Sequence, residues 1–286
     1  MLTDRRRGLD PALATVCAVR PAPTDVSATR HLIPSQLTHH PAFAPYANAH
    51  GLYQEIVNGR AAPPPDVPVF VSPPPRTVSA IDYERRVVED NALIVRADNL
   101  HDVMNALVWL TFPKTKRAIS EAHVALGVTA NATPHSRAAL HRRPRRRDVL
   151  TLFDEAGAII LSQRDDLKKL HEGHLWRELF VSHRDEFINE ARPILFGHGA
   201  LEQLSSHPHR GLTVKALWLP LAHDTPLIDV DDWMASHIAS VKLLAENEHR
   251  LPLPIAGVPG WFAENERADC YDDAAVFRPL RAMKSA

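Results

Sequence analysis

The sequence is poor in cysteine and has no long apolar run, and each lack excludes a class of protein. Its 286 residues include two cysteines, Cys17 and Cys270, which excludes a disulfide framework and a cysteine-rich zinc site. No stretch has enough consecutive apolar residues to span a bilayer as a helix. The basic start of the chain is not followed by an apolar run, so we do not expect a secretory signal. We therefore expect a protein of the reducing cytoplasm with no membrane partner.

The chain also lacks an excess of charge and the motifs of well-known enzyme classes. Its net charge is −1, so its overall charge does not favour binding to nucleic acid or to a membrane. The densest basic run, Arg142–Arg147, has no interleaved aromatic residues, and we expect it to be solvated rather than to bind nucleic acid. There is no glycine-rich phosphate loop, no G-x-S-x-G and no H-E-x-x-H. The 17 histidines permit metal or proton chemistry without specifying it.

The composition is that of an ordinary globular protein, with 45% hydrophobic and 23% charged residues. We expect residues 1–40 to form a loosely structured N-terminal arm and residues 41–286 to form a single domain. Within that domain, prolines dominate a connection near 61–76, which is expected to be extended. The segment 250–286 is rich in proline and aromatic residues and is expected to wrap over the core.

The clearest helical signals lie between residues 98 and 126. Asn99 or Asp98 can cap a helix over His101–Thr111, with a core face of aliphatic residues. The opposite stripe carries Asp98, Asp102, Asn105 and Trp109, which is either a solvated face or the wall of a pocket. Pro113 then begins a second helix that is predicted to run to about Leu126.

The strongest strand signals come later in the chain. Two apolar runs between residues 148 and 162 flank Asp154-Glu155-Ala156-Gly157, which predicts a hairpin with Gly157 in the left-handed conformation. A further strand is predicted near 212–221. We therefore expect an α+β fold with a small, mostly antiparallel sheet covered by helices.

The remaining segments are predicted to be helical. The pattern from Asp166 to about Ser205 is helical with a break at Pro193, and the helix after the break is expected to carry Ile194, Leu195 and His198. The glycines on either side of His198 leave room for a close backbone approach. Asp229 or Asp231 is expected to cap a helix that ends at about Leu244.

Several motifs resemble those of one bacterial family, the domain of unknown function 3025. They are Tyr83-Glu84, Arg96 to Asp102, Asn105 to Trp109, Phe112-Pro113-Lys114, Arg147 to Glu155, Leu195 to His198, Pro259-Gly260-Trp261, Tyr271-Asp272-Asp273 and Phe277-Arg278-Pro279. The chain departs from the pattern at Leu100, where an aromatic residue is expected. The resemblance implies a shared fold, and it implies no particular activity.

Two functions remain open from the sequence. The first is an enzyme, a hydrolase or transferase that acts on an anionic small molecule, with a divalent metal ion as a candidate cofactor. The candidate catalytic residues are His101, Asp102, Asn105, Lys114, His123, Glu155 and His198, and the candidate metal ligands are Asp154, Asp272 and Asp273. The second is a non-catalytic binding or scaffold protein, in which the same polar residues cap helices, stabilise turns and form buried networks. The two interpretations differ in whether these side chains line one cleft.

Overall fold

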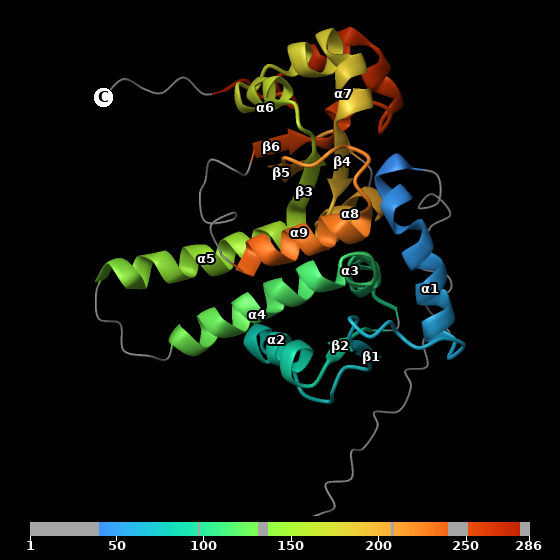
Figure 1. Ribbon diagram of the computed structural model, residues 1–286, viewed down its shortest axis with the longest axis vertical. Helices are drawn as coiled ribbons and strands as arrows, with labels where there is room; N and C mark the ends of the chain where they lie inside the picture. The colour runs from blue at the N-terminus through green and yellow to red at the C-terminus, as the bar shows by residue number, and fades with distance from the viewer. Residues whose placement is uncertain (1–39, 97, 131–136, 207–208, 240–250, 281–286) are drawn as a thin grey trace, which may run out of the picture.

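The structure, a computed structural model, describes residues 40–96, 98–130, 137–206, 209–239 and 251–280 (Figure 1). Along the chain these residues form α1 (Ala47–Val57), β1 (Val69–Val71), α2 (Ala80–Glu89), β2 (Ala92–Ile94), α3 (Leu100–Thr111), α4 (Pro113–Ala130), α5 (Arg137–Ala156), β3 (Gly157–Leu161), α6 (Asp165–Glu172), α7 (Arg184–Glu190), β4 (Arg192–Leu195), α8 (His198–Ser206), β5 (Thr213–Leu219), α9 (Leu227–Ala239) and β6 (Leu251–Pro254). Apart from His40, the predicted N-terminal arm lies outside the described residues.

Helices α3 and α4 confirm the two helices predicted from the sequence. The Asn99 side chain accepts a hydrogen bond from the Asp102 amide and so caps α3. Residues Asp102 to Trp109 are all buried, so this part of the stripe opposite the aliphatic face of α3 is not a solvated surface, whereas Asp98 at its start is exposed. Pro113 is the first residue of α4, which extends beyond Leu126 to Ala130 and lies between α2 and α9 (Figure 1).

Asp231 stabilises a different helix from the one predicted. Its carboxylate accepts hydrogen bonds from the backbone amides of Lys114 and Thr115, at 3.0 and 2.8 Å. These amides belong to the first turn of α4, where backbone donors lack partners within the helix. Asp231 itself lies inside α9, which begins at Leu227. The predicted capping group therefore joins α9 to α4.

The fold is α+β, but the main sheet is mixed rather than mostly antiparallel. Among the described residues its strand order is β4-β3-β5-β6, with β3 parallel to β5 and the other two pairs antiparallel. The strand predicted near 212–221 is β5. All residues of β3 are buried, as is usual for a central strand covered on both faces. A separate two-stranded parallel sheet joins β1 to β2.

The hairpin predicted over 148–162 is wrong. Residues up to Ala156 form the end of α5, and only Gly157–Leu161 form a strand. Leu150 and Phe153 are buried with helical spacing, and this packing prevails over the strand preference of the neighbouring β-branched residues. Gly157 does not have a positive φ; it is needed because an added Cβ would lie 2.3 Å from the Phe153 carbonyl oxygen.

The prediction of a helix carrying Ile194 and Leu195 is also wrong. Both residues lie in β4, which pairs with β3, and the helix begins only at His198. Pro193 is tolerated because β4 is an edge strand, where a missing amide hydrogen costs no ladder bond. Before β4 the chain is helical as expected, in α6, in a π-helical turn over Glu178–Ser182, and in α7.

The C-terminal segment packs beside α6 and α7 at one end of the main sheet (Figure 1). The buried Asn265 side chain donates to the carbonyl oxygens of Ala256 and Val258. The Tyr271 hydroxyl donates to the Gly257 carbonyl oxygen at 3.0 Å, and Phe277 is buried against Tyr271. These contacts give the irregular segment an ordered path.

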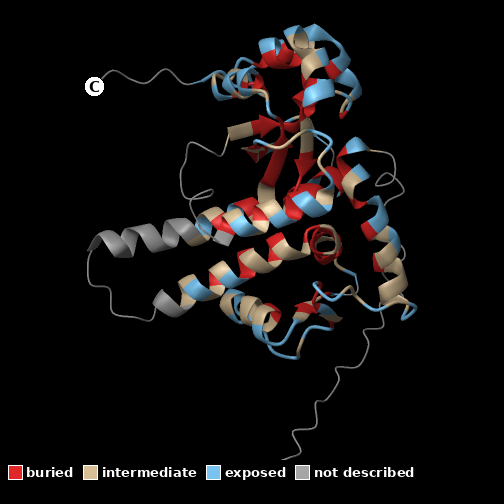
Figure 2. Cartoon of the chain, in the orientation of Figure 1, coloured by how far each residue is buried: buried red, intermediate tan, exposed pale blue. Residues whose placement is uncertain are grey.

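Burial follows the same layers, with buried residues on β3, on β5 and along the facing sides of α3, α4 and α9 (Figure 2). None of the helices in the described part of the chain has the length and apolar character to cross a bilayer.

We expect acid to destabilise the fold through His171. This fully buried imidazole bonds to the Pro252 carbonyl oxygen and accepts from the Trp218 indole, and burial lowers its pKa to about 4. The unfolded chain, with a pKa near 6.5, binds the proton more tightly. The contribution is therefore complete above about pH 6.5 and is lost as the pH falls towards about 4, at a cost of about 3 kcal/mol.

Urea unfolding of the wild type and of His171→Gln at about pH 7.5 and about pH 4.5 measures this effect. The variant is expected to be less stable at the higher pH but to lose less stability on acidification. Equal losses in the two proteins would contradict the assignment.

Candidate functional site

A cleft of about 450 Å³ lies where α2, α3, α4, α5 and α8 meet. It brings together most of the polar residues singled out from the sequence, although they come from segments far apart in the chain. The predicted residues that line it are His101, Asp102, Asn105, His123, Asp154, Glu155 and His198. These side chains therefore line one cleft, which is the arrangement that the enzyme interpretation predicts.

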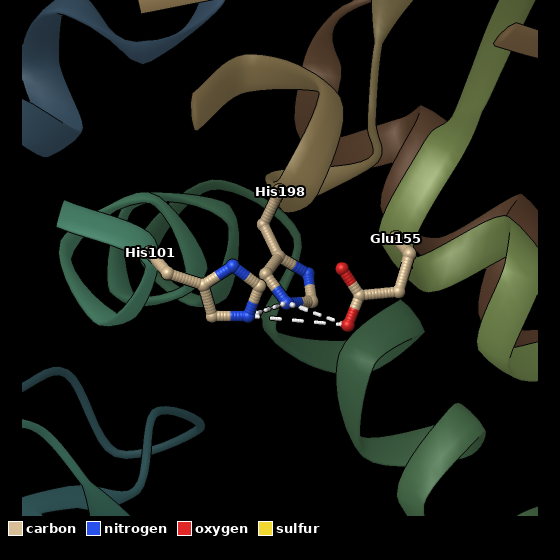
Figure 3. A group of neighbouring side chains, drawn as sticks. All are labelled: His101, Glu155 and His198. Carbon is tan, nitrogen blue, oxygen red and sulfur yellow. Dashed lines mark hydrogen bonds and ion pairs between the residues drawn. The ribbon is translucent and has the colours of Figure 1, made fainter. Parts of the chain in front are cut away.

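Three of these side chains, His101, Glu155 and His198, point their ligand atoms at a common centre (Figure 3). The two Nε2 atoms are 3.1 Å apart. Glu155 Oε1 lies 3.5 Å from His198 Nε2 and 3.9 Å from His101 Nε2. Among the histidine, cysteine and acidic residues that the structure describes, these three are the group whose ligand atoms lie close enough together to hold a metal ion.

The backbone brings the three residues together at helix ends. His101 is in the first turn of α3, Glu155 is in the last turn of α5, and His198 is the first residue of α8. A Cβ on Gly197 would lie 2.5 Å from the Ala156 amide nitrogen, and a Cβ on Gly199 would lie 2.5 Å from Glu155 Oε2. The predicted close approach around His198 is thus made against the end of α5.

The outer nitrogen of each imidazole faces a carboxylate. His101 Nδ1 lies 2.8 Å from Glu202 Oε2, and His198 Nδ1 lies 3.7 Å from Asp154 Oδ2. The first distance is a hydrogen bond, and the second places a negative charge beside a buried nitrogen that has no hydrogen-bond partner among the described residues. We assign a proton to each Nδ1, because this places an N–H toward the neighbouring carboxylate. Both Nε2 lone pairs then point to the same centre as the Glu155 carboxylate.

Asp154 is held by a buried lysine. Lys116 Nζ lies 2.5 Å from Asp154 Oδ1, and the Lys116 side chain is only 4% exposed. The same ammonium group lies 5.8 Å from the centre of the Trp109 ring, within range of a cation–π interaction. Burial alone would raise the pKa of Asp154, but Lys116 and His198 outweigh it and hold the pKa below its usual value. Asp154 therefore remains a carboxylate next to His198.

Burial acts in opposite directions on two of the converging residues. It lowers the pKa of His198 to about 4, despite the opposing charge of Asp154, so the imidazole is neutral near pH 7. It raises the pKa of Glu155, although the nearby His101 opposes the shift. A neutral imidazole and a carboxylate destabilised by burial are both suited to a metal cation.

Further polar groups line the same cleft. The Asn105 amide donates to the Tyr83 hydroxyl at 3.0 Å, and burial raises the pKa of Tyr83, so the phenol remains protonated. Burial also raises the pKa of Glu84, against a hydrogen bond from Ser120. His123 also lines the cleft, and burial lowers its pKa.

Three predicted site residues are not in the cleft. Lys114 forms an ion pair with Asp232, and Asp272 forms one with Arg177 at 2.8 Å. Asp273 accepts a hydrogen bond from the Ala275 amide, as expected for a residue that begins a turn. Neither Asp272 nor Asp273 has a partner in the candidate metal group.

The residues that sequence reasoning missed are the ones that orient the others. The candidate site residues predicted from the sequence do not include Glu202, Lys116, Arg96 or Tyr83, of which the last two belong to family motifs. The one available signal was the spacing that places Lys116 and His123 on one face of α4. The partners of Lys116 and Glu202 are 38 and 101 residues away in sequence, so local patterns could not identify them.

We expect the pair of Lys116 and Asp154 to stabilise the fold measurably. Lys116→Met should lower the free energy of unfolding by about 3–5 kcal/mol, because it leaves a largely buried carboxylate without its cation. Adding Asp154→Asn should recover a large part of this loss. Lys168→Met, which breaks an exposed pair with Glu172, should cost less than about 1 kcal/mol. Chemical denaturation with a chelator present gives all three values, and equal losses in the single and double variants would contradict the expectation.

Comparisons with known proteins give a family and nothing more specific. Neither the search of curated proteins nor the search of solved structures found a match. One family model, described as a protein of unknown function (DUF3025), matches residues 69–281. That range includes His101, Glu155 and His198, together with the other side chains that line the cleft. The chain is a member of the DUF3025 family.

Proposed function

We propose that this protein is a metal-dependent hydrolase whose metal ion is bound by His101, Glu155 and His198. The observation that carries the proposal is the convergence of two imidazole Nε2 atoms and one carboxylate oxygen within 3.1–3.9 Å of one another. With a proton on each Nδ1, all three atoms are lone-pair donors. Their mutual repulsion requires a cation or a shared proton between them.

The spacing of the three atoms favours zinc. The nearest point equidistant from all three lies in their plane at about 2.0 Å from each, which is close to the usual length of a zinc–nitrogen or zinc–oxygen bond. Ligands of a tetrahedral zinc ion are about 3.3 Å apart, whereas adjacent ligands of an octahedral ion are about 2.9 Å apart. The mean of the three observed separations, about 3.5 Å, lies closer to the tetrahedral value. Two histidines and one glutamate are also a common ligand set of catalytic zinc, with the fourth position left for water.

The surroundings of the two histidines support the same assignment. Metal-bound imidazoles almost always donate their other N–H to a carboxylate or a carbonyl, which fixes the ring and makes it a better ligand. Glu202 has this position beside His101, and Asp154 has it beside His198. Lys116 in turn keeps Asp154 charged and in place.

The cleft supplies what a hydrolytic reaction needs besides the metal. A divalent ion at this centre would lower the pKa of a bound water to about 7 and make it a nucleophile. The protonated Tyr83, held by Asn105, can donate a hydrogen bond to an oxygen that gains negative charge. Glu84, with its raised pKa, can give a proton to the leaving group. Arg96 and Arg147 on the walls suit an anionic small molecule as substrate.

Elemental analysis of the purified protein, before and after chelation, tests the metal directly. We expect about one zinc ion per chain, a lower melting temperature after chelation, and loss of stoichiometric zinc in His198→Ala and Glu155→Gln. His183→Ala, at a half-buried histidine outside the cleft, is the matched control and should keep its zinc. Iron in place of zinc would redirect the proposal towards oxygen chemistry, and no metal in any preparation would favour a non-catalytic binding protein.

Glu202→Gln should weaken zinc binding without abolishing it. The amide can still bond to His101 Nδ1 but no longer supplies a negative charge, and such changes typically reduce metal affinity or activity by about 10–100-fold. Competition with a chromophoric chelator gives the affinity. Glu186→Gln, a change of the same kind at a half-buried residue of α7 outside the cleft, is the control. An unchanged affinity in Glu202→Gln would argue against the proposed role of this carboxylate.

A further inference from the structure

A second cavity adjoins the metal cleft, and Arg96 lies where the two meet. This cavity measures about 430 Å³ and shares Val78, Tyr83, Arg96 and Asp102 with the cleft. Its other walls are Ile94 and the segment from Pro73 to Thr77. A ligand that extends from the metal centre into the second cavity would therefore pass Arg96.

The Arg96 guanidinium is fixed in place by Asp102. Its Nε and Nη2 atoms donate to the two oxygens of the Asp102 carboxylate, each at 2.8 Å. The Arg96 amide donates to the same carboxylate at 2.8 Å, and Asp102 is held in the capped first turn of α3. The side chain therefore needs no further ordering before it binds a ligand.

The fixed guanidinium still has donors to offer. Both N–H groups of Nη1 and one of Nη2 have no acceptor among the described residues, and the Arg96 side chain is 52% exposed. A planar group with adjacent N–H donors matches the oxygens of a carboxylate or a phosphate. Arg147 also lines the cleft, and its positive charge offsets the negative charge of Asp102.

The second cavity differs from the cleft in the residues that form its outer wall. Consecutive prolines, Pro73 to Pro75, make this wall stiff, and Val78 and Ile94 add apolar surface, while Arg76 and Thr77 are polar. The apolar chain of a ligand can pack against the prolines, Val78 and Ile94.

We infer that the substrate is an elongated anion whose carboxylate or phosphate group binds Arg96, with its scissile bond in the metal cleft and an apolar chain along Pro73–Val78. Arg96 is a specificity-determining residue in this arrangement. The placement of the scissile bond rests on the proposed hydrolase function, whereas binding of the anion by Arg96 can be measured with or without the metal.

Isothermal titration calorimetry with three probes of equal chain length, namely hexanoate, hexyl phosphate and hexanol, tests the inference. Each is titrated into zinc-loaded and chelated protein, and acetate and inorganic phosphate serve as probes without a chain. At least one six-carbon anion is expected to bind at least 10-fold more tightly than hexanol and than its chain-free counterpart. Which anion binds distinguishes a carboxylate substrate from a phosphate ester.

Arg96→Gln should weaken binding of the six-carbon anion at least 10-fold in both forms of the protein. Arg96→Lys keeps the charge, and so protects the fold around Asp102, but loses the planar fork; it should bind with intermediate affinity. Arg85→Gln, a matched loss of charge at an arginine that lines neither cavity, should bind like the wild type.

Equal binding in the wild type and Arg96→Gln would overturn the inference, as would a loss of binding in Arg147→Gln alone. If zinc binds as proposed but the anion does not depend on Arg96, the inference fails and the proposed function stands. If no metal binds but the anion still depends on Arg96, the proposed function fails and the anion site stands.

Discussion

The site depends on how closely the start of α8 can approach the end of α5. Gly197 and Gly199 have no side chains, and any Cβ at either position would meet the backbone of Glu155 and Ala156 or the Glu155 carboxylate. The close contact places His198 beside Glu155, and the packing of α3 against α8 adds His101. It also sets the position of the main sheet, because β3 follows directly from α5 and β4 leads directly into α8.

Charges inside the fold are arranged as a chain rather than as isolated groups. The Trp109 ring faces Lys116, Lys116 binds Asp154, and Asp154 faces the outer nitrogen of His198. On the other side of the candidate metal centre, His101 is held by Glu202. Each buried charge has a neighbour of opposite sign or a polarisable ring, which is the condition under which burial of charge is tolerated. Helix α3 supplies one imidazole, and its buried polar stripe forms part of the cleft.

Local signals predicted the elements that depend on local chemistry. The cap at Asn99 and the proline at position 113 are both properties of a few adjacent residues, and both predicted helices are present. The hairpin failed for the opposite reason. Its apolar residues before Ala156 fit strand and helix alike, and the choice was made by the packing of Leu150 and Phe153 in the core. The parallel pairing of β3 with β5 likewise depends on the path of the chain through α6, α7, β4 and α8, which no local pattern specifies.

The sequence by itself determined the α+β class, the helices around residues 100–126, the strand at 213–219 and the family. It also identified seven residues that line the cleft, because polar side chains without an evident local role are recognisable one at a time. The tertiary structure alone decided which of them converge and which are ordinary ion pairs or turn residues, as with Lys114, Asp272 and Asp273. It alone revealed Glu202 and Lys116 as the partners that orient the site. The physical reason is distance along the chain. Ligand atoms must lie within a few ångströms of one another, and here they come from α3, α5 and α8, while the orienting residues Lys116 and Glu202 come from α4 and α8.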